Sequence, residues 1–144
     1  MEPTIIPGGC YSDERGTLLY NNYFDASAIR RVYVIENKDT DFVRGWQGHR
    51  IEQRWFSAVQ GCFKIQLIYI DDWVIPSKTL VVLTFILNAE KMDVLHVPCG
   101  YVSSIKALTN GAKLLVMADY RLGEIKDEYR FEVDYFQNTI PMSC

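Results

Sequence analysis

Short runs in which apolar and polar residues alternate recur along the chain, with turn-forming residues between them. A spacing of about ten residues between such runs is typical of an all-β sandwich or barrel. The predicted strands, in chain order, are residues 17–23, 30–36, 42–50, 53–60, 62–70, 79–87, 94–97, 102–108 and 112–120. We find no internal repeat or linker, so the pattern predicts one domain over residues 1–144, with a core from about residue 11 to residue 120.

Several segments carry more specific predictions. Residues 79–87 are almost wholly apolar, so we expect a strand that is buried on both faces. Asn110-Gly111 separates residues 102–108 from residues 112–120, and Asn-Gly is the strongest short signal for a β-hairpin. The tail, residues 121–144, is predicted to be a short irregular or helical segment, and its acid-rich part, Glu124 to Asp134, to be a solvated face.

Composition and charge narrow the classes of function. The chain has 144 residues, of which 49% are hydrophobic, so it can bury a core of its own. The net charge of −3 argues against a general nucleic-acid binder. The start of the chain resembles no signal peptide, and no apolar run is long enough to cross a membrane. The four cysteines lack CxxC spacing, which predicts reduced thiols in a cytoplasmic protein, with Cys62 and Cys99 in the core.

The stretch from Phe42 to Gly61 is the candidate binding region. It gathers arginines, tryptophans, a glutamine and a histidine on what otherwise alternates as β-structure. Gln47 and His49 are two residues apart and therefore share one face of a strand. Arg44 has the opposite parity, so it reaches the same pocket only if the strand bulges, and Gly45 is a plausible position for a bulge.

The spacing in this stretch resembles the first sequence motif of the cupin superfamily. Where that motif has metal ligands, this chain has Gln47, His49 and Arg54, and at the histidine of the second motif it has Ser103. A metal-binding cupin needs imidazoles and a carboxylate, and only one of four remains. We therefore predict no metal and no cofactor.

A closer resemblance is to the metal-free nucleotide-sugar branch of this superfamily: dTDP-4-oxo-6-deoxyglucose 3,4-ketoisomerases, WxcM-like proteins and, more distantly, dTDP-4-dehydrorhamnose 3,5-epimerases. It is carried by three motifs in order, Asp13-Glu14-Arg15-Gly16, Arg31-Val32-Tyr33-Val34-Ile35 and Arg44-Gly45-Trp46-Gln47-Gly48-His49-Arg50. The resemblance implies a cupin-type jelly-roll β-barrel. It also implies an isomerase or epimerase that acts on a nucleotide-linked, dTDP-type 4-keto-6-deoxy sugar through an enediol, in polysaccharide biosynthesis.

The resemblance also suggests roles for particular residues. His49 is the candidate base, because an imidazole titrates near neutral pH. Tyr33 is the candidate proton donor or hydrogen-bond partner. The candidate substrate-binding residues are Arg15 and Arg44 for the pyrophosphate and Gln47 for a sugar oxygen, together with Arg31 and Arg54. Gln47 stands where the ketoisomerases have the first histidine of this motif and where the epimerases have their base, which makes 3,5-epimerisation doubtful.

Other interpretations stay open at this stage. Because Gln47 is not a base, the alternative hypothesis is a non-catalytic cupin that binds a sugar or nucleotide-sugar as a partner or regulatory module. A metal-dependent cupin enzyme is a third possibility. The alternative for Arg54 is an ion pair with Glu52 or Asp71 in place of a ligand contact. We expect a homodimer, since the aromatic strand of residues 53–60 needs covering.

Overall fold

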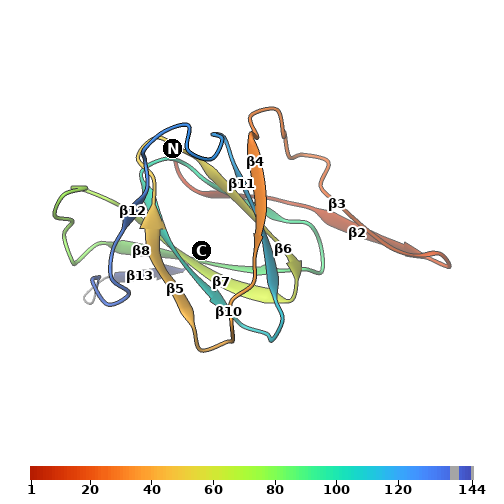
Figure 1. Ribbon diagram of the computed structural model, residues 1–144. Helices are drawn as coiled ribbons and strands as arrows, with labels where there is room; N and C mark the ends of the chain where they lie inside the picture. Colours follow the sequence, from red (N-terminus) through yellow and green to blue (C-terminus); the bar gives the residue numbers. More distant parts are fainter. Residues whose placement is uncertain (137–139, 144) are drawn as a thin grey trace.

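The computed structural model describes residues 1–136 and 140–143, and the chain in these ranges is built from β-strands without a helix (Figure 1). The strands are β1 (Thr4–Ile6), β2 (Gly9–Asp13), β3 (Gly16–Tyr20), β4 (Arg31–Ile35), β5 (Val43–Gly48), β6 (Arg54–Gln60), β7 (Cys62–Tyr69), β8 (Val81–Asn88), β9 (Val94–Val97), β10 (Tyr101–Ala107), β11 (Lys113–Ala118), β12 (Tyr129–Arg130) and β13 (Ile140–Ser143).

Two sheets face each other and form a cupin-type jelly-roll barrel, which confirms the predicted fold class. One sheet has the order β1-β9-β6-β11-β4, and the other has the order β12-β5-β10-β7-β8-β13. Every pairing within them is antiparallel except that of β13 with β8. Consecutive strands therefore often lie in different sheets, as the crossing ribbons in Figure 1 show.

The apolar core fills the space between the sheets because alternate side chains of each strand point inward. On β7, the alternating buried positions include Phe63, Ile65 and Leu67, and on β11 they include Leu114 and Val116. All of these side chains belong to one contiguous core cluster. The predicted alternation of the chain is thus the physical basis of the barrel.

The expected hairpin at Asn110-Gly111 is wrong. β10 pairs with β5 and β7, whereas β11 pairs with β4 and β6, so the turn carries the chain from one sheet to the other. Gly111 has a φ of 70° and Gly61, between β6 and β7, has a φ of 72°, a backbone region that favours glycine. Both glycines thus serve turns between sheets, which the local sequence does not distinguish from a hairpin turn.

Three burial predictions also need correction. β8 is not buried on both faces, because its Val81 and Ile86 side chains are exposed. β6 lies inside its sheet and is largely buried, so it needs no cover from a second subunit. Cys62 is half-buried and Cys99 is exposed, so neither is a core residue.

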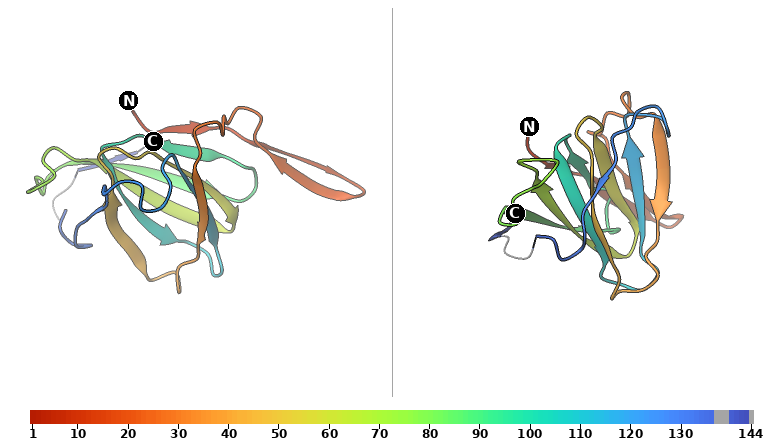
Figure 2. Two further views of the ribbon diagram at one scale, coloured as in Figure 1. Left: turned by 45° about the horizontal axis from the view of Figure 1, so that its top comes forward. Right: turned by 60° about the vertical axis from the view of Figure 1, so that its left-hand side comes forward.

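The β2–β3 hairpin projects from the barrel as a separate arm (Figures 1 and 2). It carries exposed apolar side chains, among them Tyr11 and Leu18. β4 follows the arm and lies at the edge of its sheet, with Val32 and Val34 exposed and Arg31, Tyr33 and Ile35 on the opposite face. The predicted faces of this strand are confirmed, and the polar face is the one that points toward the barrel cavity.

The prediction of an irregular or helical tail is wrong for two parts of it, because β12 and β13 are strands that add to the two edges of one sheet. Residues 121–136 contain turns and the short strand β12, which adds to the open edge of β5. In the described residues, no helix is long and apolar enough to cross a membrane. Cys144 lies outside the described residues.

Candidate active site

Two connected cavities lie at the open end of the barrel. The inner one, about 40 Å³, lies between the sheets and is lined by side chains of β4, β5, β6 and β10. The outer one, about 420 Å³, lies between the mouth of the barrel and residues 121–129. His49 and Arg54 line both cavities. Since the inner cavity has room for only a few waters, a sugar ring would have to occupy the outer one and meet His49 at the boundary.

A bulge in β5 brings the predicted residues to one cavity. Opposite β10, the register shifts between the pairs Ser103–Gln47 and Ile105–Arg44, so that β5 has one extra residue around Gly45. Arg44, Gln47 and His49 consequently all line the inner cavity despite their different parity. The bulge that the sequence analysis required is therefore present.

His49 is buried and its ring is held from one side. Its Nδ1 lies 2.8 Å from the main-chain oxygen of Asp127 and 3.3 Å from Oε2 of Glu52. A main-chain oxygen only accepts, so Nδ1 carries the hydrogen and Nε2 keeps its lone pair. Burial first, and then the charge of Arg54, lower the pKa of His49 below its ordinary value of 6.5, against the opposing charge of Glu52. A neutral imidazole with a free Nε2 can accept a proton at neutral pH.

Arg54 forms hydrogen bonds to both Glu52, which lies beside His49, and Tyr33. Its Nη2 and Nε lie 2.6 and 3.1 Å from Oε2 of Glu52, and its Nη1 donates a hydrogen bond to the Tyr33 oxygen. Both Glu52 and Arg54 are buried, so this is a charge-assisted pair in a low-dielectric setting. Because Tyr33 accepts from Arg54, its own hydroxyl hydrogen is left to donate elsewhere. Arg54 is thus committed to the pairing with Glu52 that the sequence analysis considered as an alternative.

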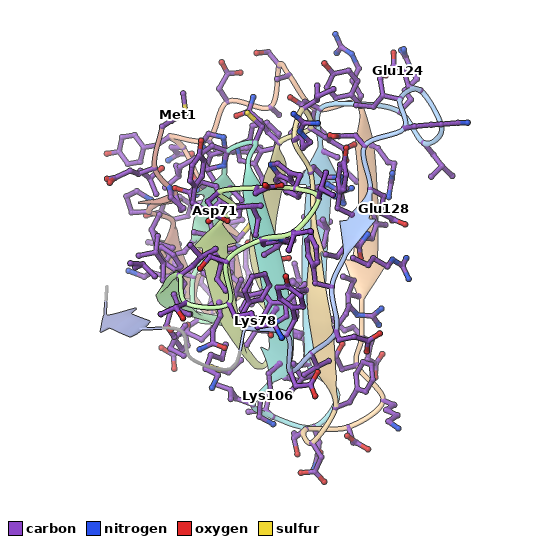
Figure 3. All side chains as sticks on the ribbon, turned by 90° about the vertical axis from the view of Figure 1, so that its left-hand side faces the viewer. Met1, Asp71, Lys78, Lys106, Glu124 and Glu128 are labelled. Atoms are coloured by element: carbon purple, nitrogen blue, oxygen red, sulfur yellow. The ribbon has the colours of Figure 1, made fainter. Side chains whose placement is uncertain are left out.

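Gln47 contacts a carboxylate of the tail. Its Nε2 lies 2.6 Å from Oε1 of Glu128, which precedes β12 beside β5 (Figure 3). A carboxylate only accepts hydrogen bonds, so the amide nitrogen must face Glu128 and the amide oxygen is free for a ligand. Gln47 therefore offers the cavity a hydrogen-bond acceptor that is not a base.

The remaining predicted arginines lie in different places. Arg31 stacks over the Tyr33 ring at 4.7 Å and lines the outer cavity. Arg44 lines the inner cavity, and its Nε lies 3.4 Å from Oδ1 of Asn37. Arg15 lies at the turn of the β2–β3 arm, paired with Asp13 at 2.8 Å. Its side chain is 82% exposed, and within one subunit it is outside both cavities.

The tail contributes residues that the sequence analysis missed. Asp127 is buried rather than solvated, and Arg121, Lys126 and Glu128 line the outer cavity. The prediction of a solvated face for residues 124–134 is therefore wrong at Asp127 and holds for Glu124, which lies on the exposed loop at the mouth (Figure 3). No local signal marks Asp127, because its partners are more than seventy residues away in the chain.

The donor set offers little to a metal ion. Among the described residues, no three His, Cys, Asp or Glu side chains converge into a group that could hold one. A guanidinium and an amide, from Arg54 and Gln47, stand beside His49 instead. The absence of a bound metal in the working protein stays a prediction.

Comparisons with known proteins agree with this architecture. The family model FdtA, described as WxcM-like, C-terminal, matches residues 3–140. The chain is similar to a histidine-to-asparagine mutant of the 3,4-ketoisomerase QdtA from Thermoanaerobacterium thermosaccharolyticum, solved with TDP-4-keto-6-deoxyglucose, with 23% identity, coverage of 94% of this chain and 92% of that chain, and a TM-score of 0.70.

Two further solved structures show the same fold. A 3,4-ketoisomerase from Helicobacter canadensis has 22% identity over 95% of this chain and 96% of that chain, with a TM-score of 0.71. The rmlC epimerase from Mycobacterium tuberculosis has 16% identity over 92% of this chain and 70% of that chain, also with a TM-score of 0.71. Among curated proteins there is no significant match.

Proposed function

Since the chain belongs to the WxcM-like, C-terminal family, we propose that it is a metal-free isomerase acting on a nucleotide-linked 4-keto-6-deoxy sugar. The proposed nucleotide is dTDP, the proposed setting is polysaccharide biosynthesis, and 3,4-ketoisomerisation is the favoured reaction. The observation that carries the proposal is His49, a buried imidazole that lines both cavities and whose Nδ1 faces the main-chain oxygen of Asp127. The chain would work as one cupin-like domain.

The chemistry needs one base and one hydroxyl. Nε2 of His49 takes the proton from C3, the electrons of that bond form a C3–C4 double bond, and the carbonyl oxygen on C4 takes a proton from Tyr33. The oxygen on C3 then returns a proton to the Tyr33 oxygen and becomes a carbonyl, while C4 receives the proton held by His49. Atoms balance, and Arg54, which donates to the Tyr33 oxygen, stabilises the transient phenolate.

The outer cavity is suited to an anionic ligand. Arg31, Arg121 and Lys126 line it, and their charges can face a diphosphate. Its volume of about 420 Å³ lies within the usual range of small-molecule sites. Gln47 would accept a hydrogen bond from a sugar hydroxyl, and Arg44 would contact the deepest part of the ligand. Because Arg54 already pairs with Glu52 and donates to Tyr33, we assign Arg54 to holding Tyr33 rather than to binding phosphate.

The protein is proposed to act as a homodimer in the cytoplasm. The exposed apolar side chains on the β2–β3 arm and on β4 support a second copy as the covering partner. Arg15, at the turn of that arm, remains a proposed substrate-binding residue that would act only if the arm reaches another subunit. Free Cys10, Cys62 and Cys99 fit a reducing compartment, and a net charge of −3 fits a small-molecule partner rather than nucleic acid.

The second candidate is a non-catalytic cupin that binds a nucleotide-sugar. Two observations favour it: Gln47 supplies no second base, and the inner cavity is too narrow for a sugar ring. In that case the outer cavity would bind the ligand without any proton transfer.

Incubation with dTDP-4-keto-6-deoxyglucose in D₂O distinguishes the two candidates. The proton held by His49 can exchange with D₂O before it is returned, so 3-keto product with deuterium at C4, or recovered substrate with deuterium at C3, is expected by NMR for the enzyme. Binding with neither is expected for the module. In the enzyme, His49→Asn should lower the exchange rate by about 10²–10⁴-fold, the usual range for a general base, with nucleotide-sugar affinity kept. His96→Asn, which changes the other histidine, is the matched control. Full exchange in His49→Asn would remove His49 from the mechanism.

A further inference from the structure

We infer that Asp127 is a positioning residue for His49: it clamps the segment between β5 and β6 from the tail and fixes which ring nitrogen faces the substrate. The inference deepens the proposed function and rests on it only in treating His49 as the base. It assigns a role to the tail, which would otherwise be an appendage to the barrel.

The first step in the argument is the carboxylate. Asp127 is only 5% exposed, and its carboxylate accepts hydrogen bonds from the main-chain nitrogens of Arg50, Ile51 and Glu52, at 2.9, 2.8 and 2.8 Å. These residues follow β5 and precede β6, so their nitrogens are outside the strands that flank them. Consecutive N–H groups that converge on one anion form a strong, directional site. The carboxylate therefore fixes the backbone immediately after His49.

The second step is the main chain of the same residue. The Asp127 oxygen accepts from Nδ1 of His49 at 2.8 Å. One residue thus holds both the ring of His49 and the three residues that follow it. A shift of the carboxylate would move the main-chain oxygen with it, so the two contacts are mechanically linked.

The third step compares Asp127 with the other contacts that could hold the tail or the His49 ring in place. β12 pairs with β5 at only two positions, Tyr129 with Gly48 and Arg130 with Gln47. The tail after β12 is held to the barrel elsewhere, by bonds of Phe131 and Val133 to Trp46, whereas the buried carboxylate of Asp127 is what holds the tail to the segment that follows His49. The charged groups that face His49 are Glu52 and Arg54 from its own segment and Asp127 from the tail. Glu52 also approaches Nδ1, but at 3.3 Å and while paired with Arg54, so it does not replace the Asp127 oxygen.

The test compares Asp127→Asn with Asp134→Asn. Both remove one negative charge from the tail, but Asp134 is exposed. An asparagine at 127 would turn an NH₂ group toward main-chain N–H donors, so the clamp would open. We expect kcat for the sugar to fall by about 10²-fold in Asp127→Asn, with little change in KM and no change in Asp134→Asn.

A merely structural role of Asp127 would also lower activity. The deciding measurement is therefore the tautomeric state of the His49 ring. The chain has two histidines, and ¹⁵N NMR with His96→Asn as a background assigns the His49 signals. We expect wild type to show Nδ1 protonated and Nε2 bare at neutral pH. Asp127→Asn should show a mixture of tautomers, because the main-chain oxygen that holds the Nδ1 hydrogen is displaced when the carboxylate contacts are lost.

Each outcome decides the inference. A wild-type tautomer in folded Asp127→Asn overturns it, whatever the activity. If that variant does not fold, Asp127→Glu is measured instead: its longer side chain displaces the main-chain oxygen, a mixed tautomer supports the inference, and the wild-type spectrum overturns it. Absence of deuterium exchange in wild type would overturn the proposed function, and the ring measurement would still decide the role of Asp127.

Discussion

At the scale of single residues, several polar side chains of the site are already hydrogen-bonded to one another before a ligand binds. Glu52 holds Arg54, Arg54 holds Tyr33, and a tail residue holds His49. Each donor or acceptor that is used within this chain is unavailable to the ligand. For the sugar ring, the proposed contacts are Nε2 of His49, the hydroxyl hydrogen of Tyr33 and the amide oxygen of Gln47, while Arg31, Arg121 and Lys126 are left for the diphosphate.

Tyr33→Phe tests the proposed proton relay between the two sugar oxygens. The variant keeps the ring over which Arg31 stacks and removes only the hydroxyl. We expect kcat for net isomerisation to fall by about 10²-fold, while deuterium exchange at C3 falls less. Tyr23→Phe, on an exposed tyrosine, is the control. A raised KM with an unchanged kcat would show that Tyr33 only binds the ligand.

The pH dependence follows from the direction of the His49 shift. The base must be neutral, so the rate should rise with pH through the pKa of His49 and then level off. Burial lowers that pKa, so the rising limb of kcat/KM should have its midpoint below pH 6.5. A pH titration of kcat/KM measures it, and a midpoint above 6.5 would contradict a buried, neutral base.

At the scale of elements, β5 is the strand that the site depends on, and its two glycines have different surroundings. A Cβ on Gly48 would meet main-chain atoms of β10, including Cα of Val102 at 2.7 Å. A Cβ on Gly45 would come too close to only one atom, Cγ2 of the exposed Val133 side chain at 2.6 Å, and would meet Cα of Val133 at an ordinary contact distance of 3.5 Å. The main chain of β10 cannot move away from a Cβ on Gly48 unless the two strands separate. A surface side chain can move away from a Cβ on Gly45 by changing its rotamer.

Gly48→Ala should therefore destabilise the fold by about 3 kcal/mol, the upper end of the range for overpacking. Gly45→Ala should cost less than about 1 kcal/mol, since a side chain yields. Denaturant unfolding measures both. Equal losses would show that the contact between β5 and β10 is looser than these positions imply.

The positions of many strands can be predicted from the sequence, because the alternation of apolar and polar residues and the length of a strand are local properties. β9 has the predicted bounds, and the β5 bulge follows from the parity of Arg44 and His49. Sheet membership cannot be predicted in this way: Asn110-Gly111 has the local chemistry of a hairpin turn, yet it joins strands of different sheets. Asp127 is hidden for the same reason, since its role depends on partners distant in the chain.

At the scale of the whole molecule, the β2–β3 arm is the feature that a single subunit leaves unexplained. A two-stranded hairpin is marginally stable alone, and this one exposes Tyr11, Leu18 and Tyr20. A second copy of the chain would bury these side chains. The arm and the edge strand β4 are close in sequence, so one interface could cover both.

Leu18→Lys tests the homodimer. We expect wild type to sediment as a dimer and Leu18→Lys to shift toward the monomer, because a charge would be placed in an apolar interface. Val74→Lys, a similar change on the exposed loop before β8, should leave the dimer intact. Wild type that sediments as a monomer at all concentrations would contradict the proposed assembly.

The contact between the tail and the segment after β5 has a consequence for how the protein is made. The bonds from Asp127 to residues 49–52 span 75 to 78 positions of the chain. Contacts between residues so far apart in sequence form slowly during folding. A nascent chain that has left the ribosome only as far as β11 can therefore assemble most of the barrel, but the environment of His49 is completed only when the last part of the chain arrives.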